Sequence, residues 1–247
     1  MNVFGVDIGG TGIKGAPVDL DKGELSDERY KVLTPHPATP DAVLDGVHDV
    51  VTHFGWKGPL GVTFPGVVMD GVTRTAANVD PGWVGFDARK ALGDRLGLPV
   101  VLLNDADAAG VAEMTFGAGR GRGGTVIVLT LGTGIGSAVF VDGRLLPNTE
   151  LGHLELHGHD AEKRASVKAR EDEDLSWEHW AHRLRKYLAH VEMLFSPDLF
   201  VLGGGVSRKS EKFLPYLHGH GLSAEIVPAE LQNNAGIVGA AMAAAKL

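Results

Sequence analysis

The stretch "VFGVDIGGTGIKGAPVDLDKGEL", residues 3–25, has the pattern of a glycine-rich hairpin, and "VIVLTLGTGIGSAVFVDGRLL", residues 126–146, repeats it about half a chain later. Each stretch is an apolar run, a Gly/Thr-rich turn, a second apolar run and an Asp/Gly turn. A tight hairpin turn is satisfied by Asn-Gly or Asp-Gly, so two turns carrying Gly-Thr-Gly need another explanation. Successive backbone N–H groups in such a turn can form a concavity for phosphate oxygens. We interpret the repeat as two related halves that both grip phosphate.

The rest of the chain alternates apolar strand patterns with amphipathic helix patterns, which is typical of α/β architecture with mixed sheets. A helix is predicted from Asp41, and a third strand of the first hairpin is predicted to end near Leu33. Neither glycine-rich turn matches a P-loop or the dinucleotide fingerprint. The seam is expected after the buried strand "PVVLLN". This predicts a first domain over 1–104, a second over 105–233, and a C-terminal helix, 234–247, that packs on the first.

Composition narrows the function classes. The 247 residues carry 23 basic and 31 acidic side chains, a net charge of −8, which argues against general coating of nucleic acid. There is no cysteine, so disulfides and thiolate metal sites are excluded. The sequence contains neither an 18-residue apolar run nor a signal-peptide pattern. We expect a soluble, cytoplasmic protein with no membrane or nucleic-acid partner.

Six motifs together resemble the ROK (repressor, ORF, kinase) sugar kinases of the actin-like ATPase superfamily. In chain order they are "DIGGTGIKG" (7–15), "GVTFPGVV" (61–68), "LLNDADAA" (102–109), "LTLGTGIGSA" (129–138), "ELGH" (150–153) and "FVLGGGVS" (200–207). Within the family, "HGHDAEKRASVKARE" (157–171) resembles the polyphosphate glucokinases most closely. The resemblance implies two duplicated actin-like (ribonuclease H-like) domains that flank a cleft.

The resemblance further implies an enzyme that phosphorylates glucose at the 6-hydroxyl, with inorganic polyphosphate and also ATP as donor, with Mg²⁺, and as a homodimer. The alternative is a strictly ATP-dependent hexokinase acting on glucose, mannose or an N-acyl hexosamine. A non-catalytic sugar-binding or regulatory protein is disfavoured because the catalytic candidate and both phosphate turns are retained. Regulators of the family carry a winged helix-turn-helix ahead of the first phosphate strand, and this chain starts at that strand.

Phosphoryl transfer to a hydroxyl needs a base near that hydroxyl and a cation near the phosphates. By resemblance Asp105 is the predicted catalytic base, and Asn104 contacts the sugar. The plain alternative is that this segment only caps a helix, with Asp107 the expected cap. By the same resemblance Asp7, at the end of a buried strand, is predicted to hold Mg²⁺, either directly or through water. A structural carboxylate that braces the turn is the competing interpretation of Asp7.

The resemblance places "ELGH" against sugar hydroxyls. The predicted sugar-binding set is Gly66, Asn78, Asn104, Asp105, Glu150, His153 and Glu162. Many family members follow this motif with a zinc-binding cysteine cluster, which this chain lacks. His153, His157 and His159 remain, but a tetrahedral site needs a fourth ligand. No zinc is expected.

The donor is predicted to lie on the two glycine-rich turns and a third turn near 204. The expected donor-binding set is Asp7, Gly9, Gly10, Thr11, Gly12, Lys14, Thr130, Gly132, Thr133, Gly134, Gly204 and Gly205. Polyphosphate additionally needs cations beyond the transferring group. The candidates are Arg120 and Arg122, the cations of the charge-dense segment and those of the long helix pattern: Lys163, Arg164, Lys168, Arg170, Arg183, Arg185 and Lys186. The alternative is that these charge runs form a solvated face. Arg120 and Arg122 are the predicted start of the track because "GRGRGG" leads into the second turn.

Overall fold

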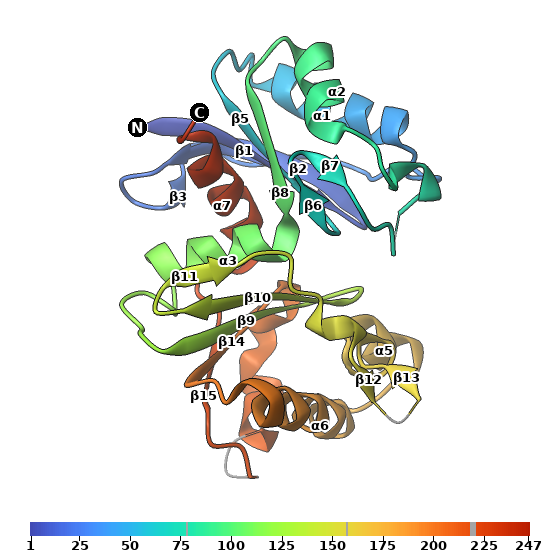
Figure 1. Ribbon diagram of the computed structural model, residues 1–247, viewed down its shortest axis with the longest axis vertical. Coiled ribbons are helices and arrows are strands. Elements are labelled where there is room, and N and C mark those ends of the chain that lie inside the picture. The colour runs from blue at the N-terminus through green and yellow to red at the C-terminus, as the bar shows by residue number, and fades with distance from the viewer. Residues whose placement is uncertain (78, 157, 218–220) are drawn as a thin grey trace. The chain divides into compact units, whose positions relative to one another are not determined.

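The computed structural model describes residues 1–77, 79–156, 158–217 and 221–247 (Figure 1). The chain folds into two compact units, residues 1–112 with 234–247, and residues 113–233. Each unit has its own mixed sheet and its own apolar core. The sequence predicts a division after Asn104, whereas the units divide after Ala112, within α3 (Asp105–Phe116).

The sheet of the first unit is built on the 3–25 hairpin. Its order is β3-β2-β1-β5-β8, and β4 also pairs with β2. β1 runs antiparallel to β2 and parallel to β5, and β5 is parallel to β8. The carboxyl ends of β1, β5 and β8 therefore lie at one edge. The strands are β1 (Asn2–Gly9), β2 (Gly12–Asp19), β3 (Glu24–Leu25), β4 (Tyr30–Val32), β5 (Leu60–Phe64), β6 (Val68–Met69), β7 (Val72–Thr73) and β8 (Val100–Asn104).

Helices cover both faces of this sheet. One face buries Phe4, Val6 and Ile8 against α1 (Pro40–His53) and α2 (Ala88–Leu96). The other face packs on α7 (Ala235–Ala244). This second approach is so close that a Cβ at Gly61 would lie 1.8 Å from the carbonyl oxygen of Ala240. Any larger residue there would force the C-terminal helix off the sheet.

The second unit contains the repeated hairpin in a sheet of order β11-β10-β9-β14-β15 (Figure 1). β9, β14 and β15 are parallel, and β10 is antiparallel to β9. The apolar stripe of α6 (Trp177–Phe195) packs on one face of this sheet, with Trp180 and Tyr187 fully buried. The strands are β9 (Thr125–Leu131), β10 (Ile135–Val141), β11 (Arg144–Leu146), β14 (Leu199–Gly203) and β15 (Glu225–Pro228).

Two segments differ from the sequence-based prediction. The third strand expected before Leu33 is two short strands, β3 and β4, that pair with β2 on either side of a bend. The charge-dense segment after 150 is ordered into short elements that have too few residues to show a period. These are η2 (Leu151–His153), β12 (Glu155–Leu156), β13 (His159–Asp160), α4 (Glu162–Ala165) and α5 (Val167–Asp172). The other short elements are η1 (Pro81–Trp83), η3 (Gly205–Lys212), η4 (Leu214–Tyr216) and η5 (Gln232–Asn234).

Across the described residues, the helices lack the combination of length and apolar character that a bilayer crossing requires.

Candidate active site

In the first unit, the predicted site residues gather at the carboxyl edge of the parallel strands. In this sheet β5 pairs with both β1 and β8. Asp7 of β1 lies opposite Thr63 of β5, and Asn104 of β8 lies opposite Phe64 of β5. Carboxyl edges of parallel strands are where open α/β sheets bind ligands. The fold thus brings Asp7 and Asn104 to one edge although they are far apart in sequence.

Asp7 is held by two neighbours on adjacent strands. Thr63 Oγ1 donates to Asp7 Oδ1 at 2.7 Å, and Lys14 Nζ lies 2.9 Å from Asp7 Oδ2. Lys14 is the residue directly opposite Asp7 in the hairpin register. Both charged side chains are largely buried, at 15% and 21% exposed, so each neutralises the other where water is scarce. The sequence assigns Lys14 to phosphate, and the structure adds that Lys14 also compensates the Asp7 carboxylate.

Thr63 was missed as a site residue. It is fully buried in the otherwise apolar strand β5, and its hydroxyl also accepts the Ile8 N–H at 3.3 Å. A buried hydroxyl needs a partner, so a lone threonine within "LGVTF" was the available signal.

Asn104 and Asp105 lie at the junction of β8 and α3. Asn104 Oδ1 accepts the Asp107 N–H at 2.9 Å, so Asn104, and not Asp107 as predicted, supplies the helix-capping oxygen. Asn104 Nδ2 donates to the Gly66 carbonyl at 3.0 Å, which ties the end of β8 to the turn after β5. Asp105 begins α3, is half-buried, and accepts the Ala106 N–H on Oδ1 at 2.8 Å.

The first glycine-rich turn is short. β1 ends at Gly9 and β2 begins at Gly12, which pair with each other, so Gly10 and Thr11 form an exposed two-residue connection. Thr34 Oγ1 donates to the Gly9 carbonyl at 2.5 Å and anchors the base of the turn. Asn78, a predicted sugar contact, lies outside the described residues.

In the second unit, the glycine turns also meet at a carboxyl edge. β9 ends at Leu131, ahead of the turn formed by Gly132, Thr133 and Gly134. β14 pairs in register so that Gly203 lies beside Thr130, which brings Gly204 and Gly205 to the same edge. The backbone of the 132–134 turn is fixed by a hydrogen bond of 3.0 Å from the Gly132 N–H to the Gly134 carbonyl.

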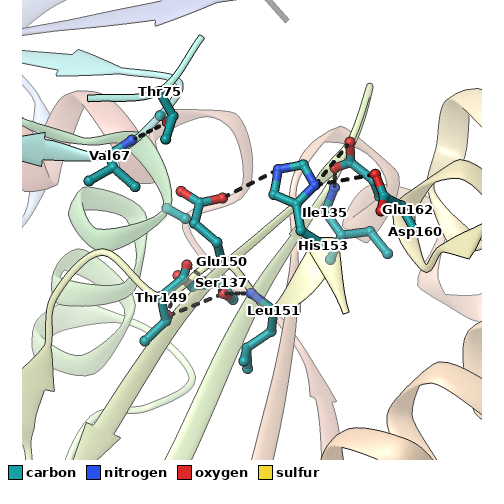
Figure 2. A network of polar contacts seen from close by, with 12 residues as sticks. Val67, Thr75, Ile135, Ser137, Thr149, Glu150, Leu151, His153, Asp160 and Glu162 are labelled. Carbon is teal, nitrogen blue, oxygen red and sulfur yellow. Dashed lines mark hydrogen bonds and ion pairs between the residues drawn. The ribbon is translucent and has the colours of Figure 1, made fainter. Parts of the chain in front are cut away.

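The "ELGH" segment at η2 meets acidic side chains of β13 and α4 in a polar cluster (Figure 2). His153 Nε2 lies 3.8 Å from Glu150 Oε2, while His153 Nδ1 lies 3.7 Å from Asp160 Oδ2 and 4.0 Å from Glu162 Oε1. Burial raises the pKa of the Glu150 carboxyl; His153 opposes this effect and Glu162 adds to it. An imidazole framed by carboxylates can donate to or accept from hydroxyl groups, as sugar recognition requires.

Glu162 connects this cluster to the phosphate turn. Its Oε2 accepts the Ile135 N–H at 3.1 Å, directly after the turn, while its Oε1 faces His153. A Cβ at Gly134 would lie 2.3 Å from Glu162 Oε2, so glycine is required there for the carboxylate to reach the backbone. Glu162 is thus brought together with both sets of predicted residues in this unit.

Two hydroxyl side chains, which the sequence analysis did not identify, fix the backbone on either side of Glu150. Ser137 Oγ donates to the Thr149 carbonyl at 2.8 Å and accepts the Leu151 N–H at 3.0 Å (Figure 2). Thr149 Oγ1 in turn donates to the Ser137 carbonyl at 2.9 Å. These bonds fix η2 on β10 and set the position of Glu150. Asp160 was also missed, because a lone carboxylate in a charge-rich segment gives no signal.

Arg120 and Arg122 are not brought to the phosphate turn. They precede the first residue of β9, whereas the turn follows its last residue. The seven extended residues of β9 separate the arginine segment from the 132–134 turn by about 20 Å. Arg122 is instead paired with Glu225, at the start of the parallel strand β15, at 2.8 Å. Proximity in sequence was misleading because a whole strand lies between.

No group of three or more His, Asp or Glu side chains is arranged to hold a metal ion within the described residues, which leave out His157. Asp7 offers carboxylate oxygens near the 9–12 turn. The expected absence of zinc therefore stays a prediction.

Comparisons with known proteins agree with this geometry. The ROK family model matches residues 3–166. The chain is 55% identical over 241 residues to a polyphosphate glucokinase of Mycobacterium tuberculosis (strain CDC 1551 / Oshkosh), covering 97% of this chain and 90% of the relative.

Two solved structures are similar along nearly the whole chain. One is an inorganic polyphosphate/ATP-glucomannokinase from Arthrobacter sp. strain KM, with TM-score 0.96 and 53% identity, covering 99% of this chain and 98% of the other. The other is a ROK family glucokinase from Streptomyces griseus in complex with glucose and AMPPNP, with TM-score 0.84 and 28% identity, covering 100% of both chains. The predicted actin-like α/β fold class is confirmed. The motif resemblance is confirmed as well, and the chain belongs to the ROK family.

Proposed function

We propose that this protein is a glucokinase that transfers a phosphoryl group from inorganic polyphosphate, and also from ATP, to the 6-hydroxyl of glucose. The observation that carries the proposal is the position of Asp105, at the carboxyl edge of the sheet and on the first residue of α3. The choice of sugar and donors rests on the relatives, which are named polyphosphate glucokinase and polyphosphate/ATP-glucomannokinase. The predicted kinase activity agrees with both names.

In the reaction, the Asp105 carboxylate accepts the proton of the 6-hydroxyl as O6 attacks the terminal phosphorus. The new O6–P bond forms while the bond to the leaving phosphate oxygen breaks, giving glucose 6-phosphate and a donor one phosphate shorter. A positioned base contributes about 10²- to 10⁴-fold in rate. The neighbouring Asn104 amide is fixed by Asp107 and Gly66, so the base sits on a rigid junction.

Sugar hydroxyls are proposed to contact Glu150 and His153, with Glu162 holding the imidazole from its other side. Asn104, Gly66 and Asn78 complete the proposed sugar set. The Glu150 carboxylate suits this role because its burial strengthens any hydrogen bond that it accepts.

The phosphates are proposed to lie on three glycine turns. These include Gly9, Gly10, Thr11 and Gly12 in the first unit, and Thr130, Gly132, Thr133, Gly134, Gly204 and Gly205 in the second. Lys14 supplies the positive charge at the first of them. Exposed backbone N–H groups and a lysine form the kind of cradle that phosphate oxygens prefer.

Mg²⁺ is the cation that this proposal implies, and the donor set at Asp7 fits it. Mg²⁺ prefers oxygen ligands and keeps several waters, bound through one or two carboxylates and the substrate phosphates. Asp7 offers such a carboxylate, and each of its oxygens has lone-pair capacity beyond the bonds from Thr63 and Lys14. When bound, the ion would neutralise charge on the transferring phosphates.

We also propose that the enzyme works in the cytoplasm as a homodimer. One coupled assay tests the main proposal. Purified protein with glucose and Mg²⁺ should form glucose 6-phosphate with either donor. Activity with ATP alone would instead support the strictly ATP-dependent hexokinase, and activity with neither would overturn the assignment.

A further inference from the structure

A cluster of cations surrounds one partly exposed tryptophan in the second unit. The Arg170 guanidinium carbon lies 3.8 Å from the centroid of the Trp177 ring. Lys209 Nζ and Lys212 Nζ lie 6.0 and 5.9 Å from the same centroid. We call Arg170, Trp177, Lys209 and Lys212 the Trp177 cluster. Significant cation–π contacts occur about once per 70–80 residues, so three cations on one ring are a concentration of charge that needs a reason.

Within the described part of the chain, none of the three cations forms an ion pair with a carboxylate. Two of the nearby acids pair with other cations, while Glu171 and Glu211, next to Arg170 and Lys212 in sequence, form no ion pair with the cluster within the described residues. Asp172 pairs with Lys168 at 2.7 Å, and Glu173 pairs with Arg183 at 2.6 Å. Like charges held near one another repel unless an anion joins them. The cluster therefore has the electrostatics of a site that takes a polyanion.

The cluster is connected to the phosphate turns from two directions. α5, which carries Arg170, starts beside the 132–134 turn, because the Lys168 N–H donates to the Gly132 carbonyl at 3.1 Å. η3, which carries both lysines, starts at Gly205, directly after the other glycine turn. A 3₁₀ segment rises about 2 Å per residue, so Lys209, four residues after Gly205, lies about 8 Å beyond that turn, and the chain bends at Lys209 before it reaches Lys212.

The shape of the cluster favours phosphates over a nucleobase. Arg170 covers the Trp177 ring at 3.8 Å, and Phe213 packs nearly parallel to that ring, with an interplanar angle of 21°. A purine could stack on the face covered by Arg170 only by displacing the guanidinium. The two lysines, by contrast, are exposed and can reach an anion without rearrangement.

We propose that the Trp177 cluster binds the distal phosphates of long-chain polyphosphate, beyond those held by the glycine turns. The inference rests on the proposed function, because it assigns the extended part of the same donor. It also replaces Arg120 and Arg122, which lie at the opposite end of β9. ATP and tripolyphosphate end after three phosphates and would not engage the lysines.

The test is the double variant Lys209→Gln with Lys212→Gln, which removes both charges but keeps most of the side-chain length. The matched control is Lys22→Gln with Lys57→Gln, two exposed lysines of the first unit. A third variant, Arg120→Gln with Arg122→Gln, tests the rival cations. KM and kcat are measured for long-chain polyphosphate, tripolyphosphate and ATP at saturating glucose and two ionic strengths.

The Lys209/Lys212 variant should raise KM for long-chain polyphosphate by about 2- to 30-fold, the size expected for two exposed ion pairs. Its kcat, its glucose KM and its constants for tripolyphosphate and ATP should stay within about twofold of the control. Added salt should weaken long-chain polyphosphate more in wild type than in this variant, because fewer ion pairs remain to be screened.

Two results would overturn this inference and leave the proposed function intact. In the first, the Lys209/Lys212 variant has the same KM for long-chain polyphosphate as the lysine control. In the second, that variant loses affinity equally for all three donors. A selective loss in the Arg120/Arg122 variant would assign the track to the other end of the sheet. Wild type that uses ATP but not polyphosphate would overturn the proposed donor, and the cluster assignment with it.

Discussion

Replacing Asp105 by Asn should leave the fold intact and remove most of the phosphoryl transfer. The amide keeps an oxygen that can accept the Ala106 N–H, which Asp105 Oδ1 now accepts at 2.8 Å. The substitution removes the negative charge on the first residue of α3. That charge is favourable near a helix N-terminus by about 0.3–1 kcal/mol, so we expect a destabilisation of at most about 1 kcal/mol.

The catalytic loss should be much larger. Asn has no basic oxygen to take the 6-hydroxyl proton, and general-base catalysis contributes about 10²- to 10⁴-fold. At 1.36 kcal/mol per factor of ten, this is about 3–5 kcal/mol of transition-state stabilisation. The loss should appear in kcat for both donors, with the glucose KM changed little, because the proton acceptor serves the chemical step common to both.

The matched control is Asp87→Asn. Asp87 Oδ1 accepts the Lys90 N–H at 3.0 Å at the start of α2, so the same substitution is made at another helix start of the same unit. Thermal melts should shift by similar small amounts in both variants, while only Asp105→Asn loses turnover. Turnover of Asp105→Asn within a few-fold of wild type would refute its role as the base. A collapse of its melting temperature would refute the structural argument.

The remaining predictions concern Glu150, His153, Lys14 and zinc. Glu150→Gln and His153→Ala should each raise the glucose KM by roughly 5- to 100-fold and leave the donor KM almost unchanged, since a lost buried partner costs about 1–3 kcal/mol; a change confined to the donor KM would contradict this. Because burial raises the pKa of the Glu150 carboxyl, the folded state holds that proton more tightly than the unfolded chain, and the associated stability is lost as pH rises through the raised pKa. Glu150→Gln should therefore melt higher than wild type near pH 7, with the gap closing as pH falls; a gap independent of pH would refute the cause. Lys14→Gln should lower the melting temperature, because it leaves the Asp7 carboxylate without its ion pair, and should raise the KM of both donors; unchanged values in both assays would remove Lys14 from the site. Elemental analysis should find substoichiometric zinc, and a full equivalent would restore the histidines as a metal site.

Periodicity and turn residues were sufficient to predict the two hairpins and most of the strands and helices around them. The glycine turns mark strand ends, and apolar alternation marks the strands between. The same reasoning gave Asn104 and Asp105 a place at a strand end, because a buried apolar run there stops at two polar side chains. It could not decide which residue caps α3, since Asn and Asp are both good caps.

Pairings made across the sheet were harder to predict. The hydrogen bond from Thr63 to Asp7 depends on the parallel pairing of β1 and β5, and no local sequence pattern predicts that pairing. Arg120 was placed near a phosphate turn because few residues separate them, but those residues are an extended strand. Sequence distance is a good guide within a helix and a poor one along a strand, where each residue advances about 3.3 Å.

Glu162 shows why the second unit has to be considered as one site. Its carboxylate binds the Ile135 N–H with one oxygen and faces His153 with the other. A Cβ at Gly134 would displace that carboxylate from its present position. Glu162 itself, unlike Glu150 or His153, therefore contacts both the polar cluster and the backbone that follows the 132–134 turn. Under the proposed function, Glu162 contacts both the sugar set and the donor turn, so we expect a substitution at Glu162 to alter the KM of both substrates, and substitutions at Glu150 to alter that of the sugar alone.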